Sequence, residues 1–178
     1  YPVVLKIVAE GLLHKSDAGG IKLNIKDDEE LRVAYDNLIA HIAKVEPNAK
    51  IQGAMVERMA EKGQEVIVGM RRDETFGPMM MFGMGGTMVE LLKDINFKIA
   101  PLSREDILAM IDETIAGRLM KGFRGSKPAD MEAVIDVIAR LSQLAIDNPE
   151  IEEIEINPLI VYPEGKGVVA IDSRAILK

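Results

Sequence analysis

Length, composition and charge already exclude several classes of protein. The 178 residues are enough to bury a sizeable core, and 22 lysine and arginine residues against 29 aspartate and glutamate residues give a net charge of −7. An acidic chain without a dense basic run argues against electrostatic binding of nucleic acid, and no apolar run approaches the roughly 18 residues of a membrane-spanning helix. No amino-terminal signal peptide is recognisable, so we expect a cytoplasmic protein without a membrane partner.

The cysteine and histidine content limits the metal chemistry. The chain has no cysteine and only 2 histidines, His14 and His41. Disulfides, cysteine-ligated zinc, iron–sulfur clusters and multi-histidine metal sites are therefore excluded. Any bound metal is expected to be a hard, oxygen-ligated cation such as Mg²⁺. Because Tyr1-Pro2 leads directly into an apolar strand, we also expect the chain to be a fragment of a longer protein.

The first third of the chain predicts two strands and a helix. Val3 to Val8 is a short β-branched run typical of a buried strand, and a polar loop with glycines follows from Gly11 to Gly20. Ile21 to Lys26 alternates strictly between apolar and polar residues, which indicates a half-buried strand. Asp27 or Asp28 is expected to cap a helix with an apolar stripe that ends before Pro47-Asn48.

The rest of the chain mixes strands and helices without a regular βαβ alternation, which favours an α+β fold. A capping-box pattern at Ser103 predicts one helix, and a second is expected to begin near Asp130. Five further strands are predicted: Ile51–Glu57, Glu65–Met70, Met79–Phe82, Ile154–Tyr162 and Gly167–Ile171. We place one domain at residues 1–58, with its amino-terminal part missing, and a second at residues 59–178.

Two features of the first domain have the chemistry to meet phosphate groups. Lys6 interrupts a buried strand, where it either points at phosphate oxygens or extends its ammonium to water at the strand edge. The loop from His14 to Gly20 combines an imidazole, an ammonium and a hydroxyl with glycines that let backbone N–H groups approach phosphate oxygens. It does not match a Walker loop. His41 borders the apolar stripe of a helix, and we expect a surface residue whose replacement leaves activity intact.

Carboxylates and one amide mark a second candidate site. Glu57 and Glu65 lie at strand edges, where they either hydrogen-bond a ribose or an exocyclic amine or face solvent. Asn157 lies in one predicted strand and Asp172 ends the next, so a hairpin brings the two side chains together. An amide oxygen with a carboxylate suits Mg²⁺, which takes its other ligands from water and nucleotide phosphates. The structural alternative is that Asn157-Pro158 only begins a bend.

Several motifs together resemble one known family. The chain resembles the ATP-grasp domain of the nucleoside-diphosphate-forming acyl-CoA synthetases, of the β-subunit type of ADP-forming acetyl-CoA synthetase. The motifs run in family order over essentially the whole chain, and His14–Gly20 (HKSDAGG) is the most specific. The others are Pro2–Lys6 (PVVLK), Phe82–Gly86 (FGMGG) with Val89-Glu90, Gly122–Gly125 (GFRG) and Glu155–Pro158 (EINP).

The resemblance implies an ATP-grasp fold of two α+β lobes with ATP or ADP between them. His14 corresponds to a histidine that accepts a phosphoryl group and passes it to ADP, and Arg124 either binds a phosphate or anchors a loop. Met55 to Glu57 is implied to form the hinge that meets the adenine, and Glu65 to reach the ribose. Asn157 and Asp172 are implied to hold Mg²⁺. The implied nucleotide-binding residues are Lys6, Lys15, Ser16, Gly19, Gly20, Met55, Val56, Glu57 and Glu65.

The implied reaction is acyl-CoA + ADP + phosphate ⇌ acid + CoA + ATP, in which this chain supplies nucleotide binding and the phosphoryl relay. Its partner is the CoA-binding, ligase part of the same enzyme, as a separate subunit or in the same chain, within an oligomer. A non-catalytic ATP-grasp module of a larger protein acetyltransferase is one alternative. A succinyl-CoA synthetase-like ligase is the other, and His14 argues against it.

Overall fold

The chain folds as two separate compact units. The computed structural model describes residues 1–12, 15–86 and 92–178. Unit 1 runs from Tyr1 to Glu61 and unit 2 from Lys62 to Lys178, whereas the sequence analysis placed the boundary between residues 58 and 59. The strand pairs of both units are antiparallel and combine with helices, which confirms the α+β class. Within the described ranges, no helix has both the length and the apolar character needed to cross a membrane.

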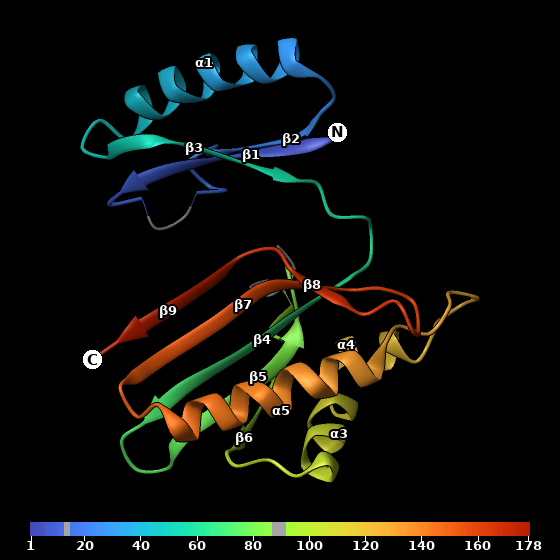
Figure 1. Ribbon diagram of the computed structural model, residues 1–178. Coiled ribbons are helices and arrows are strands. Elements are labelled where there is room, and N and C mark those ends of the chain that lie inside the picture. Colours follow the sequence, from blue (N-terminus) through green and yellow to red (C-terminus); the bar gives the residue numbers. More distant parts are fainter. Residues whose placement is uncertain (13–14, 87–91) are drawn as a thin grey trace. The chain divides into compact units, whose positions relative to one another are not determined.

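Unit 1 is a three-stranded sheet packed against one helix. Its strands are β1 (Val3–Glu10), β2 (Ile21–Ile25) and β3 (Lys50–Arg58), arranged in the order β2-β1-β3. The helix α1 (Asp28–Val45) lies along one face of this sheet (Figure 1). Because side chains alternate along a strand, β1 sends Leu5 and Ile7 toward the helix and Lys6 to the opposite face. The core of unit 1 consists of Leu5, Ile7, Ile25, Leu38 and Ile42.

The start of α1 is fixed by the local sequence. Asp27 is the N-cap, and its carboxylate accepts a hydrogen bond of 2.8 Å from the backbone N–H of Glu30. Three acidic residues, Asp28, Glu29 and Glu30, occupy the first turn, where the helix dipole favours negative charge. The expected cap and helix are therefore both confirmed.

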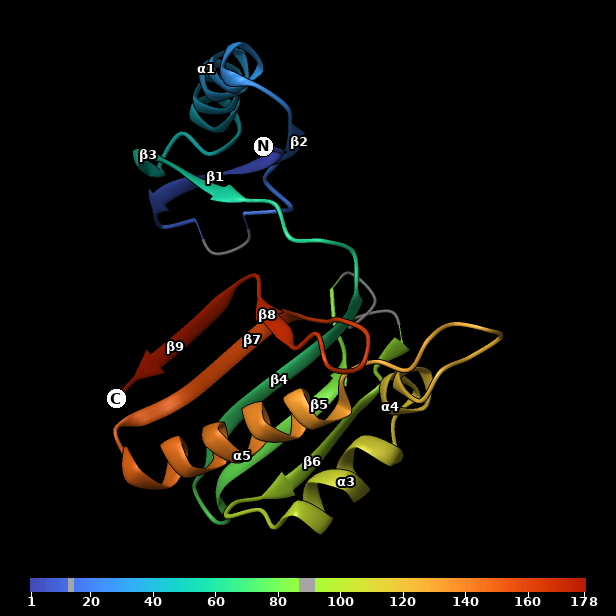
Figure 2. The same ribbon diagram turned by 45° about the vertical axis from the view of Figure 1, so that its right-hand side comes forward.

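Unit 2 is a six-stranded sheet with helices on one face. Its strands lie in the order β6-β5-β4-β7-β8, and β9 also pairs with β7. Figure 2 shows the helices of this unit gathered on the same side of the sheet. The strands are β4 (Gln64–Asp73), β5 (Gly77–Met84), β6 (Ile95–Ile99), β7 (Ile151–Val161), β8 (Val168–Ala170) and β9 (Ser173–Leu177). The helices are α3 (Arg104–Asp112), α4 (Ile115–Met120) and α5 (Met131–Asp147).

The capping box at Ser103 and the helix start at Asp130 agree with the sequence analysis, but three elements were not predicted. These are β6, α4 and β9. The helix α4 has only 6 residues, too few to show a helical period. Its N-cap is Thr114, whose hydroxyl accepts a hydrogen bond of 2.9 Å from the backbone N–H of Gly117. The distant carboxylate of Asp94 accepts two more, of 2.8 Å, from the backbone N–H groups of Ile115 and Ala116, and this second contact leaves no local pattern in the sequence.

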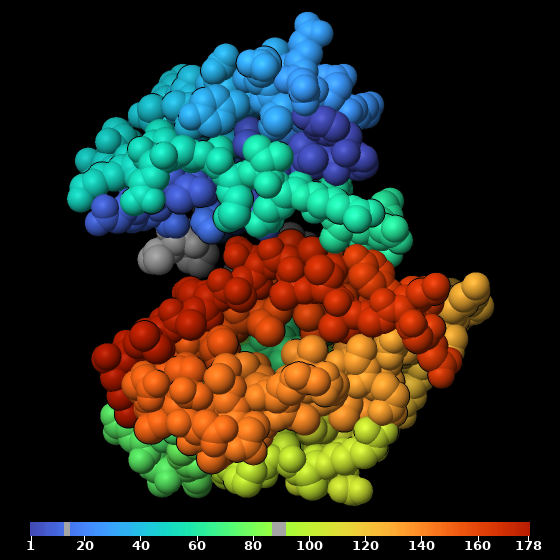
Figure 3. Space-filling model, viewed as in Figure 1, coloured from blue at the N-terminus to red at the C-terminus, as the bar shows by residue number. Residues whose placement is uncertain are grey.

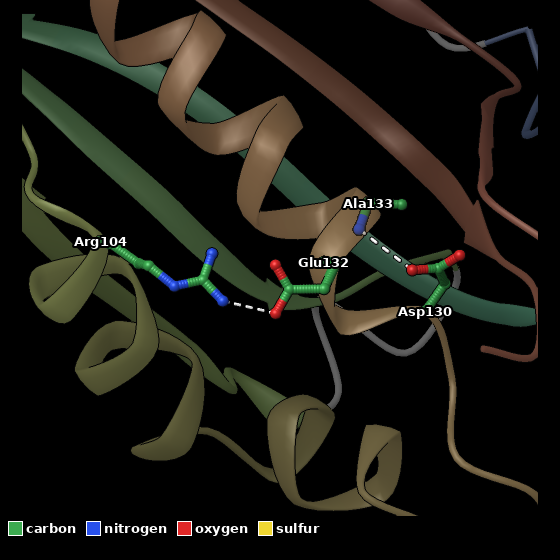
Figure 4. A network of polar contacts seen from close by, with 4 residues as sticks. All are labelled: Arg104, Asp130, Glu132 and Ala133. Carbon is green, nitrogen blue, oxygen red and sulfur yellow. Dashed lines mark hydrogen bonds and ion pairs between the residues drawn. The ribbon is translucent and has the colours of Figure 1, made fainter. Parts of the chain in front are cut away.

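Asp130 joins α5 to the turn after β7. Its carboxylate accepts hydrogen bonds from the backbone N–H groups of Ala133, at 3.1 Å, and of Gly167, at 2.8 Å. These N–H donors, with that of Gly167 dominant, hold the pKa of the Asp130 carboxyl below its ordinary value. Next to it, Glu132 pairs with Arg104 and so links α5 to α3 (Figure 4). Asp130 is buried, so both of its oxygens contribute to the stability of unit 2.

Replacing Asp130 by asparagine is expected to destabilise unit 2 by about 1–3 kcal/mol, because the amide NH₂ cannot accept the Gly167 hydrogen bond. A lowered folded-state pKa means that this stabilisation is present above the unfolded pKa of about 3.9. It is lost as the pH falls through the folded value. Urea unfolding should therefore show the difference between the two proteins at pH 7 and a smaller one below about pH 4. Exposed Asp136→Asn is the matched control, and an equal loss there would contradict this role.

Candidate functional site

Unit 1 places a charged pair on the face of its sheet opposite α1. Lys6 is 6% exposed, and its Nζ lies 2.7 Å from a carboxylate oxygen of Glu57. In the strand register Glu57 is opposite Val4, two residues before Lys6, so both side chains emerge on the same face. A buried ammonium is tolerated only with partners of this kind. Lys6 is therefore a fixed positive charge within the sheet and does not extend into bulk water.

Two large apolar side chains on β3 are exposed, on opposite faces of the strand. Met55 is directly opposite Lys6 in the register, on the face of the charged pair, and is 45% exposed, while Val56 is opposite Leu5, on the other face, and is 49% exposed. A flat base needs apolar surface of this kind next to backbone hydrogen-bonding groups. The strand β3 is also at the edge of its sheet, where an exposed residue needs no functional explanation. The adenine contact of Met55, Val56 and Glu57 remains a prediction.

The loop that joins β1 to β2 is closed by its own backbone. The N–H of Gly19 donates to the carbonyl of Ser16 at 3.0 Å, and the N–H of Gly20 donates to the carbonyl of Lys15 at 2.7 Å. A Cβ on Gly20 would lie 2.5 Å from Ile7 and 2.8 Å from the Lys15 carbonyl, so only glycine fits. The two glycine N–H groups thus shape the loop. His14 lies outside the described residues.

His41 contacts this loop, which the sequence analysis did not expect. Its Nε2 is 3.2 Å from the backbone carbonyl of Ala18. A Cβ on Gly19, whose φ is +70°, would approach that nitrogen to 2.9 Å. His41 is exposed, as expected, and its ring also contacts the loop from Lys15 to Gly20. The contact connects residues far apart in the sequence, and no helical pattern could reveal it.

Unit 2 brings Asn157 and Asp172 together. The pairing of β7 with β4 shifts between Val66 and Val68, so Asn157 and Pro158 bulge out of the regular ladder. On the other side of β7, Asp172 lies in the junction between β8 and β9. The backbone N–H of Asn157 donates to the Asp172 carbonyl at 3.1 Å. The backbones of the two residues are therefore hydrogen-bonded, whereas the approach of their side chains stays a prediction. Asn157-Pro158 lies within β7 and does not end it.

A glycine turn holds the Asn157 side chain and lies against Glu65. The backbone N–H of Gly86 donates to Oδ1 of Asn157 at 3.0 Å, and Glu155 lies on the other side of that amide. The N–H of Gly85 donates to the Glu65 carbonyl at 3.0 Å. A Cβ on Gly86 would lie 1.8 Å from the Glu65 carboxylate, so the absence of a side chain makes room for that group. Glu65, Gly86, Asn157 and Asp172 thus form one connected corner of unit 2.

The chemistry of this corner fits a hard cation. Asn157 Oδ1 accepts one hydrogen bond and keeps a second lone pair, and Asp172 adds an exposed carboxylate. Among the described residues there is no cluster of three or more His, Asp or Glu side chains that could enclose a metal. Two oxygen donors without a protein cage suit Mg²⁺, which completes its shell with water and phosphate oxygens. The donor set is therefore compatible with the metal implied by the sequence.

Arg124 lies apart from this corner. It follows α4 in a loop that projects from the rest of unit 2 (Figures 1 and 2). It has a positive φ of 48°, and its guanidinium carbon is 5.3 Å from the centre of the Phe123 ring. Within the described part of the chain, no contact joins Arg124 to Asn157 or Asp172. A phosphate-binding role for Arg124 stays a prediction.

The candidate residues lie in both units, which Figure 3 colours along the chain, unit 1 in blue to green-cyan and unit 2 in green to red. Unit 1 carries Lys6, Glu57 and the loop from Lys15 to Gly20, and unit 2 carries Glu65, Asn157 and Asp172. Sequence reasoning missed the Lys6–Glu57 pair and the hydrogen bond from Gly86 to Asn157. Both connect elements whose register is set only by the sheet. The signals available in the sequence were Lys6 within an apolar strand and the glycine pair Gly85-Gly86.

Comparison with protein families gives a match over nearly the whole chain. Residues 1–177 match the model of an ATP-grasp domain. The chain is 48% identical over 177 residues to the β subunit of an ADP-forming acetate–CoA ligase I from Pyrococcus furiosus, of which it covers 75%. It is 46% identical over 177 residues to the ADP-forming acetate–CoA ligase I of Archaeoglobus fulgidus, of which it covers only 25%.

A solved structure shows the same fold with ligands. It is the acetyl-coenzyme A synthetase 1 of Candidatus Korarchaeum cryptofilum in complex with coenzyme A and Mg-AMPPCP, with a phosphohistidine segment pointing towards the nucleotide-binding site. The TM-score is 0.85 at 43% identity, and the match covers 100% of this chain and 77% of that one. The β-subunit match and the domain match agree with the motifs described above. The chain therefore belongs to the ATP-grasp domains, in the family of the ADP-forming acetate–CoA ligases.

Proposed function

We propose that this chain binds ATP or ADP with Mg²⁺ and relays a phosphoryl group in an ADP-forming acyl-CoA synthetase, most simply with acetyl-CoA as the acyl donor. The observation that carries the proposal is the approach of Asn157 and Asp172 beside the Gly85-Gly86 turn, because this oxygen pair fits a nucleotide-bound cation. The family match and the nucleotide analogue bound to the Korarchaeum relative support it. A cytoplasmic location is part of the same proposal.

The residues of this chain have separate roles in the proposed transfer. Lys6, fixed by Glu57, neutralises phosphate charge, and the loop from Lys15 to Gly20 lies over the phosphates. Asn157 and Asp172 would hold Mg²⁺, which when bound would neutralise charge on the phosphate oxygens. Met55 offers apolar surface to the adenine on the face of Lys6, Val56 is the neighbouring residue of the proposed hinge, and Glu65 offers a carboxylate to the ribose.

His14 is proposed as the residue that carries the phosphoryl group. A neutral imidazole carries a lone pair on one ring nitrogen, and that nitrogen can attack phosphorus. In the direction of ATP synthesis, a terminal phosphate oxygen of ADP attacks the phosphorus of the phosphohistidine. The P–O bond of ATP forms, the P–N bond breaks, and the electron pair returns to the imidazole. The reverse reaction phosphorylates His14 and releases ADP.

The partner in this proposal is the CoA-binding, ligase part of the enzyme. The chain covers three quarters of the Pyrococcus β subunit but a quarter of the Archaeoglobus relative, so the relatives differ in how much sequence accompanies this domain. Activation of the acid and transfer to CoA are assigned to that accompanying part. Acyl-CoA and phosphate are then its substrates, and the phosphohistidine is the shared intermediate.

The test compares two samples. One is the full-length protein together with any separate ligase subunit, and the other is these 178 residues alone. The full assembly is expected to form ATP from acetyl-CoA, ADP and phosphate, and the 178 residues by themselves are expected to form none. A coupled assay for ATP measures both. ATP formation by the isolated 178 residues would contradict the division of roles. An assembly that forms no ATP with acetyl-CoA or other acyl-CoA thioesters would contradict the proposed reaction.

A further inference from the structure

The contact between His41 and the Lys15–Gly20 loop has a consequence for the proposed reaction, on which this inference rests. We propose that His41 is a positioning residue: it donates a hydrogen bond from Nε2 to the Ala18 carbonyl and thereby fixes the loop that carries Lys15 and Ser16. The distance between the two atoms is 3.2 Å. Because a carbonyl oxygen can only accept, the proton of this hydrogen bond belongs to the imidazole.

The helix α1, which carries His41, is anchored in the core of unit 1. Leu38 and Ile42, its neighbours on α1, are fully buried in the core of unit 1, and each is 0% exposed. The helix is therefore fixed against the sheet. The His41 side chain, which extends from this helix to the loop, can for that reason hold the loop in one position. The loop returns to β1 as well, since the Ile7 N–H donates to the Gly20 carbonyl at 2.8 Å. One end of the loop is thus held by the sheet and its middle by the helix.

The loop is shaped to admit the imidazole. At Gly19 a Cβ would come within 2.9 Å of His41 Nε2 and 3.3 Å of the adjacent ring carbon. Its φ of +70° is also a conformation that favours glycine. Glycine at this position therefore allows both the turn and the close approach of the ring. The hydrogen bond to Ala18 and the steric fit at Gly19 thus both involve the His41 ring.

The hydrogen bond does not depend on the charge of His41. The neutral Nε2–H tautomer and the imidazolium both carry a proton on Nε2, so both can donate to Ala18. The role proposed here is mechanical support across neutral pH. Reaction rates respond strongly to such support, because a displacement of about 1 Å in a positioning group can cost roughly 100-fold in rate.

The experiment uses the full-length protein and three variants. His41→Phe keeps an aromatic ring but removes the donor, and His41→Gln places an amide NH₂ at a similar reach. Asn37→Phe, at an exposed position on the same helix, is the matched control. We expect His41→Phe to slow the incorporation of label from γ-labelled ATP by about 10- to 100-fold. His41→Gln and Asn37→Phe should stay within a few-fold of the unsubstituted protein, and all should melt at nearly the same temperature, because both positions are exposed.

Hydrogen exchange separates this inference from the proposed function. The N–H groups of Gly19 and Gly20 are hydrogen-bonded within the loop, and in His41→Phe they are expected to exchange roughly fivefold faster. That readout needs no phosphoryl transfer, so it holds even for a protein that takes no label. Unchanged exchange in His41→Phe would overturn the positioning role. An equal loss of labelling in His41→Phe and His41→Gln would overturn the hydrogen bond as its basis.

Discussion

Replacing His14 by asparagine in the assembled enzyme should abolish ATP formation, with a loss on the order of 10³-fold or more. Asparagine keeps a side chain of similar reach and one hydrogen-bonding edge but has no nucleophilic nitrogen. Nucleotide affinity should stay within a few-fold, because Lys6, Asn157 and Asp172 are unchanged. Steady-state ATP synthesis and calorimetry with ATP measure the two quantities separately.

The position of the label provides the second half of this test. After incubation with γ-labelled ATP, digestion at lysine and arginine separates the peptide of residues 7–15, which contains His14, from that of residues 33–44, which contains His41. The digestion is carried out at neutral or alkaline pH, since phosphohistidine is labile in acid. Label is expected on the first peptide only. Wild-type turnover of the His14→Asn variant, or label on the peptide with His41, would show that the relay does not pass through His14.

Replacing Asp172 by alanine should remove the dependence of nucleotide binding on Mg²⁺. The carboxylate is one of the two protein oxygen donors proposed for the metal, and the loss of a direct ligand is expected to cost at least about 100-fold in the affinity for Mg-ATP. The unsubstituted full-length protein should show a comparable loss when EDTA removes the metal. In Asp172→Ala, EDTA should then have little further effect. Calorimetry with ATP, with and without Mg²⁺, gives the four affinities.

Glu150→Ala is a suitable control for this series. Glu150 is an exposed acidic residue of unit 2 just before β7, so its removal changes the net charge as Asp172→Ala does. It should leave the affinity for Mg-ATP within a few-fold of the starting value. If the Asp172→Ala protein binds Mg-ATP normally, or if EDTA does not weaken binding to the unsubstituted protein, the metal site at Asn157 and Asp172 is wrong.

The interpretation of His41 changed most between sequence and structure. From the sequence alone, a histidine that borders an apolar helical stripe is expected to be a surface residue whose replacement leaves activity intact. The structure places it against Ala18, so a substitution there tests the support of the loop. The two histidines are therefore expected to give different results: loss of chemistry for His14, and a slower reaction with a more mobile loop for His41.

The amino-acid sequence by itself determined the local elements and the chemistry available to them. The β-branched run from Val3 to Val8 forms the strand β1, and the caps at Asp27, Ser103 and Asp130 begin their helices as predicted. These features depend on neighbours within a few residues, so a local pattern contains them. The motifs also indicated the family, which the domain match confirmed.

Only the tertiary structure decided which of these residues meet. The pairing of Lys6 with Glu57, the hydrogen bond from Gly86 to Asn157 and the contact of His41 with Ala18 all join distant segments. Each depends on a strand register or on the position of a helix over its sheet. Register is set by the packing of whole elements, since a shift of one residue would turn every side chain to the other face. No short stretch of sequence carries that information.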